Sequence, residues 1–195
     1  MTKVGIVIFD RFTDIDAIMH WDLLNRVRLD FGMSEFEVKL LGTESSHISS
    51  AGLRIPVSSS IEEIPKLDAV VLASGWGTRS LIEDKNYLEK LGSMLDPSKQ
   101  LLAAQCSGSL LLGAIGLLNG IQVTGYPPII KLLETYQAIP VNQSFVVDNN
   151  IATASSCLSS PQLSFWLIEN LVDIKMAKKV MESSQPIGDY VLSEI

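Results

Sequence analysis

The sequence is short of basic residues and has no long apolar segment. Its 22 acidic residues outnumber 15 lysines and arginines, which gives a formal net charge of −7. Because no basic stripe is present, nucleic acid is not expected as a partner. No apolar run is clean enough to span a bilayer, and the first residues, MTKVGIVIFDRF, lack the features of a signal peptide. We therefore expect a cytoplasmic protein that does not bind membranes.

Cysteine is also scarce, and the chain shows no repeats and no Pro- or Ser-rich linkers. The two cysteines, Cys106 and Cys157, are far apart in the sequence. Without a secretion signal, free thiols are expected rather than a disulfide. A length of 195 residues suits one domain with a full core, so residues 1–195 are predicted to form a single domain.

Apolar residues make up 47% of the chain, as in a globular protein with buried strands. β-branched apolar runs alternate with helical patterns, which favours an α/β fold with a mostly parallel sheet and helices on both faces. In such a fold, chemistry gathers at the carboxyl ends of the strands. We expect strands at 3–9, 36–42, 68–74 and 100–105, a hairpin within 47–58, two strands within 143–155, and helices at 14–31, 79–95, after residue 106, at 127–136 and at 159–183.

Cys106 lies in the stretch AQCSGS, where an expected strand meets an expected helix. A nucleophile elbow has the pattern small residue, x, nucleophile, x, glycine, in which x is any residue. Free N–H groups at the start of a helix lower a thiol pKa, so we predict a reactive thiolate. Those N–H groups, that of Ser107 among them, can also hold a developing negative charge. The alternative is a buried structural thiol, because free cysteine is among the most buried residue types.

Two other segments follow strands and are expected at the same edge of the sheet. The stretch SGWGT offers the N–H of Gly75 as a further donor to a developing anion, or is a simple glycine-rich turn. Asp14 and Asp16 follow the first strand, and Asp14 is favoured as a helix cap. Asp16 has apolar neighbours, which raise the pKa of a carboxyl group and allow it to donate a proton. Asp16 is therefore the predicted general acid/base.

These segments resemble the ThiJ/PfpI superfamily, and the resemblance covers nearly the whole chain. It is strongest to the isonitrile hydratase branch, whose C-T-G-S-L elbow is followed by L-G-A-x-G-L-L-x-G. Here CSGSL begins at Cys106, and LGAIGLLNG begins at Leu112. The branch's L-D-L-x-G-P-x-E/D-V motif corresponds to IDAIMHWDLL, which aligns Asp16 with the acid and Asp22 with the helix carboxylate.

The resemblance implies a class I glutamine amidotransferase-like, flavodoxin-type three-layer fold, a homodimer, and no cofactor or metal. It implies that Cys106 attacks the terminal carbon of an isonitrile while Asp16 protonates it. Water then completes hydration to an N-substituted formamide. The Ser107 hydroxyl positions water or substrate in this interpretation.

The sequence departs from the family motifs around this site. Met19–His20 replaces Gly-Pro, and the T-T-H-W segment reads VTGYP, so Tyr126 stands at the family's histidine. That change argues against a Cys–His pair like that of the peptidase and glyoxalase-like branches. His20, four residues after Asp16, either reaches the site or is an ordinary helix residue. Cys157 stands where glycine or a small residue is common.

The pocket walls and the second thiol allow more than one interpretation. Trp76 and Tyr126 either line an apolar substrate pocket or serve packing alone. Cys157 is a second active-site thiol, a resolving partner for Cys106, or a buried small residue, which is the favoured interpretation. The first function hypothesis is a small-molecule enzyme, isonitrile hydratase-like or an amidase/peptidase-like hydrolase. The others are a redox- or stress-responsive protein with an oxidisable Cys106, and a non-catalytic sensor.

Overall fold

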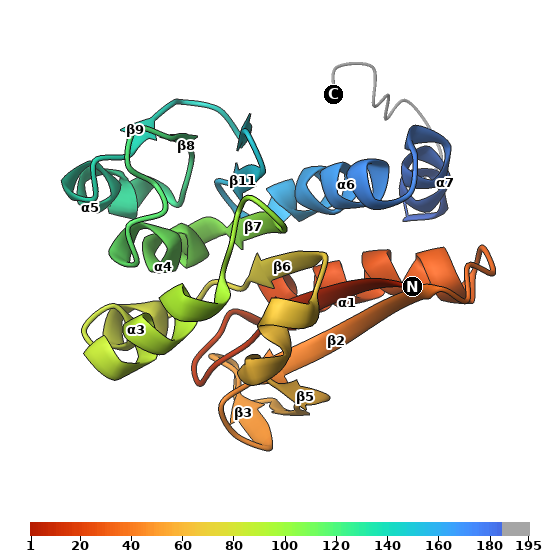
Figure 1. Ribbon diagram of the computed structural model, residues 1–195, viewed down its shortest axis with the longest axis horizontal. Helices are drawn as coiled ribbons and strands as arrows, with labels where there is room; N and C mark the ends of the chain where they lie inside the picture. Colours follow the sequence, from red (N-terminus) through yellow and green to blue (C-terminus); the bar gives the residue numbers. More distant parts are fainter. Residues whose placement is uncertain (185–195) are drawn as a thin grey trace.

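The computed structural model describes residues 1–184 as alternating strands and helices (Figure 1). The strands are β1 (Thr2–Val7), β2 (Phe36–Gly42), β3 (Ser46–Ile48), β4 (Arg54–Pro56), β5 (Ser59–Ser60), β6 (Ala69–Leu72), β7 (Leu101–Gln105), β8 (Gln122–Val123), β9 (Ile139–Pro140), β10 (Phe145–Asp148) and β11 (Ile151–Ala154). The α-helices are α1 (Asp14–Leu29), α2 (Thr78–Leu81), α3 (Lys85–Met94), α4 (Ser109–Ala114), α5 (Ile130–Thr135), α6 (Ser160–Leu171) and α7 (Ile174–Ser184). The 3-10 helices are η1 (Ile61–Lys66), η2 (Cys106–Gly108), η3 (Pro127–Ile129) and η4 (Cys157–Ser159).

The central sheet has the strand order β10-β11-β7-β6-β1-β2-β5 and is parallel except for the antiparallel pair β10–β11. Strand β6 is buried at every position, as its unbroken apolar sequence AVVL predicts for a strand covered on both faces. The expected α/β fold with a mostly parallel sheet is confirmed, as is the small hairpin, which forms from β3 and β4.

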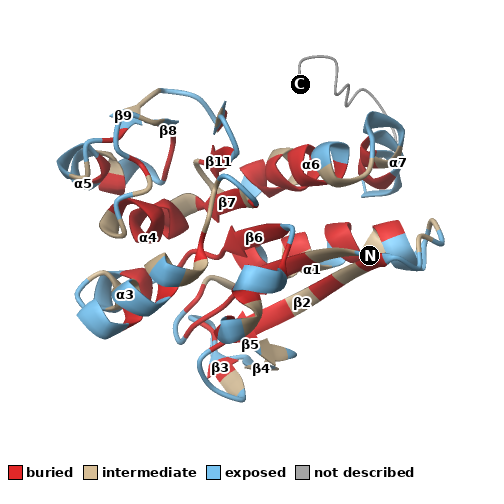
Figure 2. Ribbon diagram, viewed as in Figure 1, coloured by how far each residue is buried: buried red, intermediate tan, exposed pale blue. Residues whose placement is uncertain are grey.

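Helices cover both faces of this sheet, which gives three layers (Figure 1). Helices α1, α6 and α7 pack against one another, while η1, α3, α4 and α5 belong to the other layer. Figure 2 shows the buried residues concentrated in the sheet and on the helix surfaces that face it. The buried positions of α1 recur at helical spacing and include Asp16 and His20. Within residues 1–184, no helix combines the length and the apolar character needed to cross a bilayer.

Two of the expected helices are each broken in two. The helix expected at 79–95 is interrupted between α2 and α3, where the Asp84 carboxylate accepts a hydrogen bond from the N–H three residues later. The helix expected at 159–183 ends at Leu171. At the start of α7, the Asp173 carboxylate accepts a hydrogen bond from the N–H of Met176. In both places an aspartate inside an amphipathic pattern caps a new helix, because its side chain satisfies a free N–H group.

The parallel order brings the segments that follow β1, β6, β7 and β11 to one edge of the sheet. Strands β1, β6 and β7 are neighbours, and β11 pairs with β7 so that Ala154 lies opposite Gln105. The residues after Gln105 and after Ala154 therefore leave the sheet side by side. This edge carries the site described next.

Candidate active site

Cys106 occupies a strained turn between β7 and α4. Its φ of 53° is in the left-handed region, which is unfavourable for a residue with a side chain. A Cβ atom added to Gly108 would lie 2.7 Å from the carbonyl oxygen of Ala73, so only glycine lets the following helix begin this close to the end of β6. The backbone thus has the strand–turn–helix geometry of a nucleophile elbow.

The loop after β6 lies directly against the loop after β1. Gly75 has a φ of 144°, and a Cβ atom there would collide with the carbonyl oxygen of Arg11. The Thr13 N–H donates a hydrogen bond of 2.8 Å to the carbonyl oxygen of Ser74. This close approach brings the start of α1, and with it Asp16, to the edge of the sheet that carries Cys106.

A pocket of about 450 Å³ opens over this edge and takes residues from all four strand ends. It brings together most of the residues singled out in the sequence, and adds several that the sequence did not indicate. Its lining consists of Thr13, Asp16, Ser74, Gly75, Trp76, Arg79, Cys106, Ser107, Tyr126, Pro128 and Cys157.

Asp16 is the buried acid of this pocket. Its side chain has no exposed surface, and the Ser74 hydroxyl donates a hydrogen bond to its carboxylate. Burial raises the pKa of Asp16, because the charged form loses its hydration. The carboxyl group therefore has the electrostatic environment expected for a general acid/base at this position.

The prediction that the helix lowers the pKa of Cys106 is wrong. Burial of the sulfur, followed by the charge of Asp16, raises the pKa of the thiol to about 11. The Ser107 N–H, the Ser74 hydroxyl and the charge of Arg79 act in the opposite direction but are outweighed. Helix α4 is only six residues long, so its dipole is too weak to reverse the effect of burial next to an acid. The resting thiol is therefore protonated at neutral pH.

Cys157 lines the pocket beside Asp16, which differs from the buried small residue that the sequence favoured. Burial and the adjacent Asp16 carboxylate raise the pKa of its thiol to about 12. Both cysteines begin a 3-10 turn after paired strands, and in both turns the serine three residues later donates to the cysteine carbonyl oxygen. The signal in the sequence is this repeated Cys-x-x-Ser spacing after two apolar strands.

His20 does not reach the pocket, so the hypothesis that it replaces a catalytic imidazole is wrong. The side chain is fully buried, with Nδ1 2.8 Å from the Ser164 hydroxyl and Nε2 3.3 Å from the amide oxygen of Gln105. The amide nitrogen of Gln105 donates to the carbonyl oxygen of Ser156. Burial lowers the pKa of His20 to about 4, so the ring is neutral and its Nε2–H donates to Gln105. Helix α6 covers this turn of α1, and His20 instead links the segments that carry the two cysteines.

The backbone donor predicted at Gly75 is occupied in this structure. Its N–H donates a 3.1 Å hydrogen bond to the Ser107 hydroxyl oxygen, which also lies 3.3 Å from the Thr78 hydroxyl. The Ser107 side chain therefore holds the loop after β6 rather than standing free for water or substrate. The Ser107 N–H remains directed at the Cys106 sulfur.

Trp76 and Tyr126 form the mouth of the pocket, with exposed fractions of 56% and 43%. The guanidinium carbon of Arg79 lies 4.3 Å from the centroid of the Trp76 ring, a cation–π contact. The mouth thus combines aromatic surface with a positive charge, and the floor holds two thiols and an acid.

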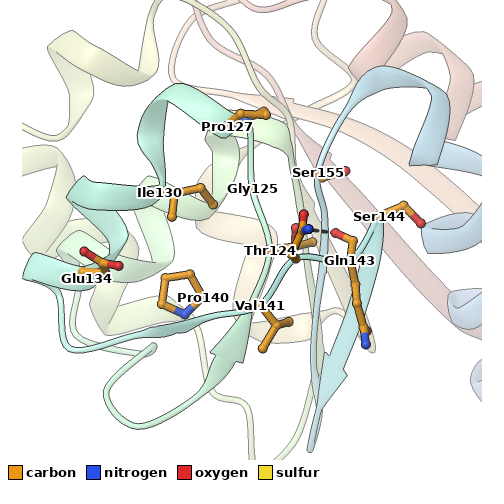
Figure 3. A pocket seen from close by; sticks show the side chains of 11 residues that line it. Thr124, Gly125, Pro127, Ile130, Glu134, Pro140, Val141, Gln143, Ser144 and Ser155 are labelled. Atoms are coloured by element: carbon orange, nitrogen blue, oxygen red, sulfur yellow. Dashed lines mark hydrogen bonds between the residues drawn. The ribbon is translucent and has the colours of Figure 1, made fainter.

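A second pocket of about 460 Å³ lies between α5 and the strands that follow it (Figure 3). Its wall includes Thr124, whose hydroxyl donates to the carbonyl oxygen of Gln143, and Glu134 is its single ionisable residue. Its lining has serine and threonine hydroxyls but no cysteine, no histidine and no pair of titratable groups, so its size does not make it the reaction site. Across residues 1–184, no three or more His, Cys, Asp or Glu side chains are grouped to hold a metal ion.

Comparisons with known proteins agree with this fold. The DJ-1/PfpI family matches residues 2–170. An isonitrile hydratase from Pseudomonas putida is 28% identical over 91% of this chain and 75% of its own length. Protein DJ-1 homolog A from Arabidopsis thaliana is 26% identical over 85% of this chain, which spans only 42% of that protein. A ThiJ/PfpI family protein from Pseudomonas syringae has a TM-score of 0.83 at 21% identity, over 98% of this chain and 78% of its own, which shows a shared fold.

Proposed function

The chain belongs to the DJ-1/PfpI family, and on that premise we propose that it is a cysteine-dependent enzyme that hydrates small isonitriles to N-substituted formamides. The observation that carries the proposal is the shared pocket of Cys106, held at positive φ, and Asp16, a buried acid with a raised pKa. A thiol and an acid can carry out several reactions, and the similarity to an isonitrile hydratase supports this one.

The first step adds the Cys106 thiol to the terminal carbon of the isonitrile, R–N≡C. A sulfur–carbon bond forms and the same carbon gains a proton, which gives the thioimidate R–N=CH–S–Cys106. In the proposal, ionised Asp16 accepts the thiol proton and passes it to this carbon. The negative charge of Asp16 opposes ionisation of the thiol, because it helps to raise the thiol pKa. Transfer of the thiol proton to Asp16 neutralises that charge as the sulfur becomes negative, so the total charge of the pocket does not change.

The second step releases the product with water. Water adds to the thioimidate carbon, the carbon–sulfur bond breaks, and Cys106 leaves with a proton as R–NH–CHO forms. The Ser74 hydroxyl, which donates to Asp16, holds the carboxyl group in place through both proton transfers. Trp76 and Tyr126 at the mouth provide apolar surface for the R group.

The test is turnover of cyclohexyl isocyanide, followed by the appearance of the formamide in the NMR spectrum. Cys106→Ala and Asp16→Asn are expected to lose at least 100-fold in rate, the order of a lost nucleophile or general acid. In H₂¹⁸O the formamide oxygen is expected to carry the label. Absence of turnover in the native protein, or turnover that survives in Cys106→Ala, contradicts the proposal.

A redox role is the second candidate, because two thiols share the pocket. A hydroperoxide would oxidise Cys106 to the sulfenic acid with release of an alcohol, and Cys157 would then displace water to form a disulfide. The raised pKa of both thiols makes oxidation slow at neutral pH and places this function second. Mass spectrometry of tryptic peptides after mild peroxide treatment tests it. A disulfide between peptides 100–131 and 132–175 supports the role with Cys157 as the resolving thiol, sulfinic acid on an unlinked Cys106 removes only the disulfide step, and a Cys106 that stays reduced contradicts the role.

An amidase- or peptidase-like hydrolase with a Cys–His pair is not favoured. The chain has two histidines; His20 lies behind the pocket and His47 in the hairpin, where its Nδ1 is 3.2 Å from Asp10. Neither lines the Cys106 pocket. For the assembly, we keep the homodimer that the family resemblance implies, to be tested by light scattering on the purified protein.

A further inference from the structure

Arg79 is the single basic residue in the lining of the Cys106 pocket. It lies at the mouth, with its guanidinium group over the Trp76 ring. The ion pairs found within residues 1–184 all involve other cations, so none of the described acids neutralises this charge. An arginine that is held by stacking keeps its N–H groups available to a planar anion.

The rest of the pocket does not supply a competing anion at the mouth. Trp76, Tyr126 and Pro128 in the lining carry no charge, and the only acid in the lining is Asp16, which is fully buried. The charge of Arg79 is nevertheless felt at the Cys106 sulfur, where it favours the thiolate. A ligand between the two groups thus meets a nucleophile at one end and a positive charge at the other.

We infer that Arg79 is an anion-binding subsite, and that the molecule that reacts with Cys106 carries a carboxylate at the end opposite the attacked carbon. The apolar walls accommodate a short apolar or aromatic middle, and a volume of about 450 Å³ holds a small molecule of this shape. The statement that the anion belongs to a substrate rests on the proposed function. The statement that the subsite binds carboxylates is independent of that function.

The experiment compares the alkylation of Cys106 by iodoacetate and by iodoacetamide. Both reagents form a sulfur–carbon bond with loss of iodide, and they differ in the charge of the group that would face Arg79. Trypsin cleavage after Lys131 separates Cys106 from Cys157, so the rate at Cys106 is read by peptide mass spectrometry. The measured quantity is the ratio of the iodoacetate rate to the iodoacetamide rate, in which any change of the Cys106 pKa cancels.

In Arg79→Gln this ratio is expected to fall by up to about fivefold, the upper limit that one unit charge gives in water when it is at contact distance. Arg79→Lys is the matched control, because it keeps the charge, and its ratio is expected to stay within twofold of the native value. The native ratio is also expected to fall with added salt, while that of Arg79→Gln stays flat. An unchanged ratio in Arg79→Gln overturns the inference and leaves Arg79 as a cation that only packs on Trp76.

A measurement on the native protein keeps the inference testable if the variants do not fold. Benzoate is expected to slow the reaction of Cys106 with iodoacetamide more than benzamide does at equal concentration. Equal protection by the two compounds overturns the subsite. These outcomes are separate from those of the turnover assay: charge selectivity without isonitrile turnover keeps the subsite and removes the proposed function, and turnover without charge selectivity does the reverse.

Discussion

His20 provides the sharpest physical test of the structure, because its neutral state depends on the packing of α1, α6 and β7. The ring is fully buried and bonded to Ser164 and Gln105. Its pKa is lowered from 6.5 to about 4, mainly by burial. At 1.36 kcal/mol per pKa unit, this difference corresponds to about 3 kcal/mol of stability that depends on pH.

The sign follows from which state binds the proton. Above pH 6.5 the imidazole is neutral in both states, and the full contribution to stability is present. Between pH 6.5 and about 4 the unfolded chain binds a proton at His20 that the folded chain does not, so the free energy of unfolding falls as the pH falls. The loss is expected to reach about 1 kcal/mol at pH 5.5 and about 3 kcal/mol at pH 4.

The variant His20→Gln isolates this contribution. Glutamine can donate to Gln105 and accept from Ser164 but does not titrate, and the carboxylates that unfold the protein in acid are the same in both proteins. Urea unfolding, followed by tryptophan fluorescence at pH 7, 5.5 and 4, gives the difference in stability between native protein and variant. That difference is expected to shrink by about 3 kcal/mol from pH 7 to pH 4. Parallel stability curves for the two proteins refute the burial of a neutral imidazole at this position.

Two other predictions concern the pocket. Burial is the main cause of the raised pKa of the Cys106 thiol, and the charge of Asp16 adds to it. In Asp16→Asn the pKa is therefore expected to fall below about 11 but to stay above the ordinary value, because a neutral amide removes the charge and leaves the burial. The pH dependence of iodoacetamide alkylation measures the midpoint, and an unchanged midpoint contradicts the contribution of Asp16. Gly75→Ala is expected to lower the free energy of unfolding by at least about 2 kcal/mol, since the new Cβ meets the carbonyl oxygen of Arg11 at a φ that only glycine tolerates. Gly52→Ala is the control, with positive φ but open space around the new methyl group, and urea unfolding that shows equal losses for the two variants would rule out the close contact between the loops.

The sequence pattern predicted the strands of the central sheet except the two-residue β5, and it predicted the elbow at Cys106, because both depend on local features. Unbroken apolar runs indicate strands covered on both faces, and the small residues around Cys106 permit the turn that its φ of 53° confirms. The breaks before Asp84 and Asp173 escaped prediction, although aspartate caps are a local signal. An amphipathic pattern continues through both breaks, and periodicity alone cannot separate one long helix from two capped ones.

The state of the site depends on contacts between residues that are distant in the chain. Nothing local to Cys106 places the Asp16 charge beside it, yet burial and that charge decide that the thiol keeps its proton. Helical spacing puts His20 and Asp16 on the same side of α1, but only the packing of α6 sends one into the core and leaves the other at the pocket. By itself the sequence determined which residues can do chemistry, because residue type and turn geometry are local. The tertiary structure decided which of them meet and which hold a proton, because desolvation and charge act through space.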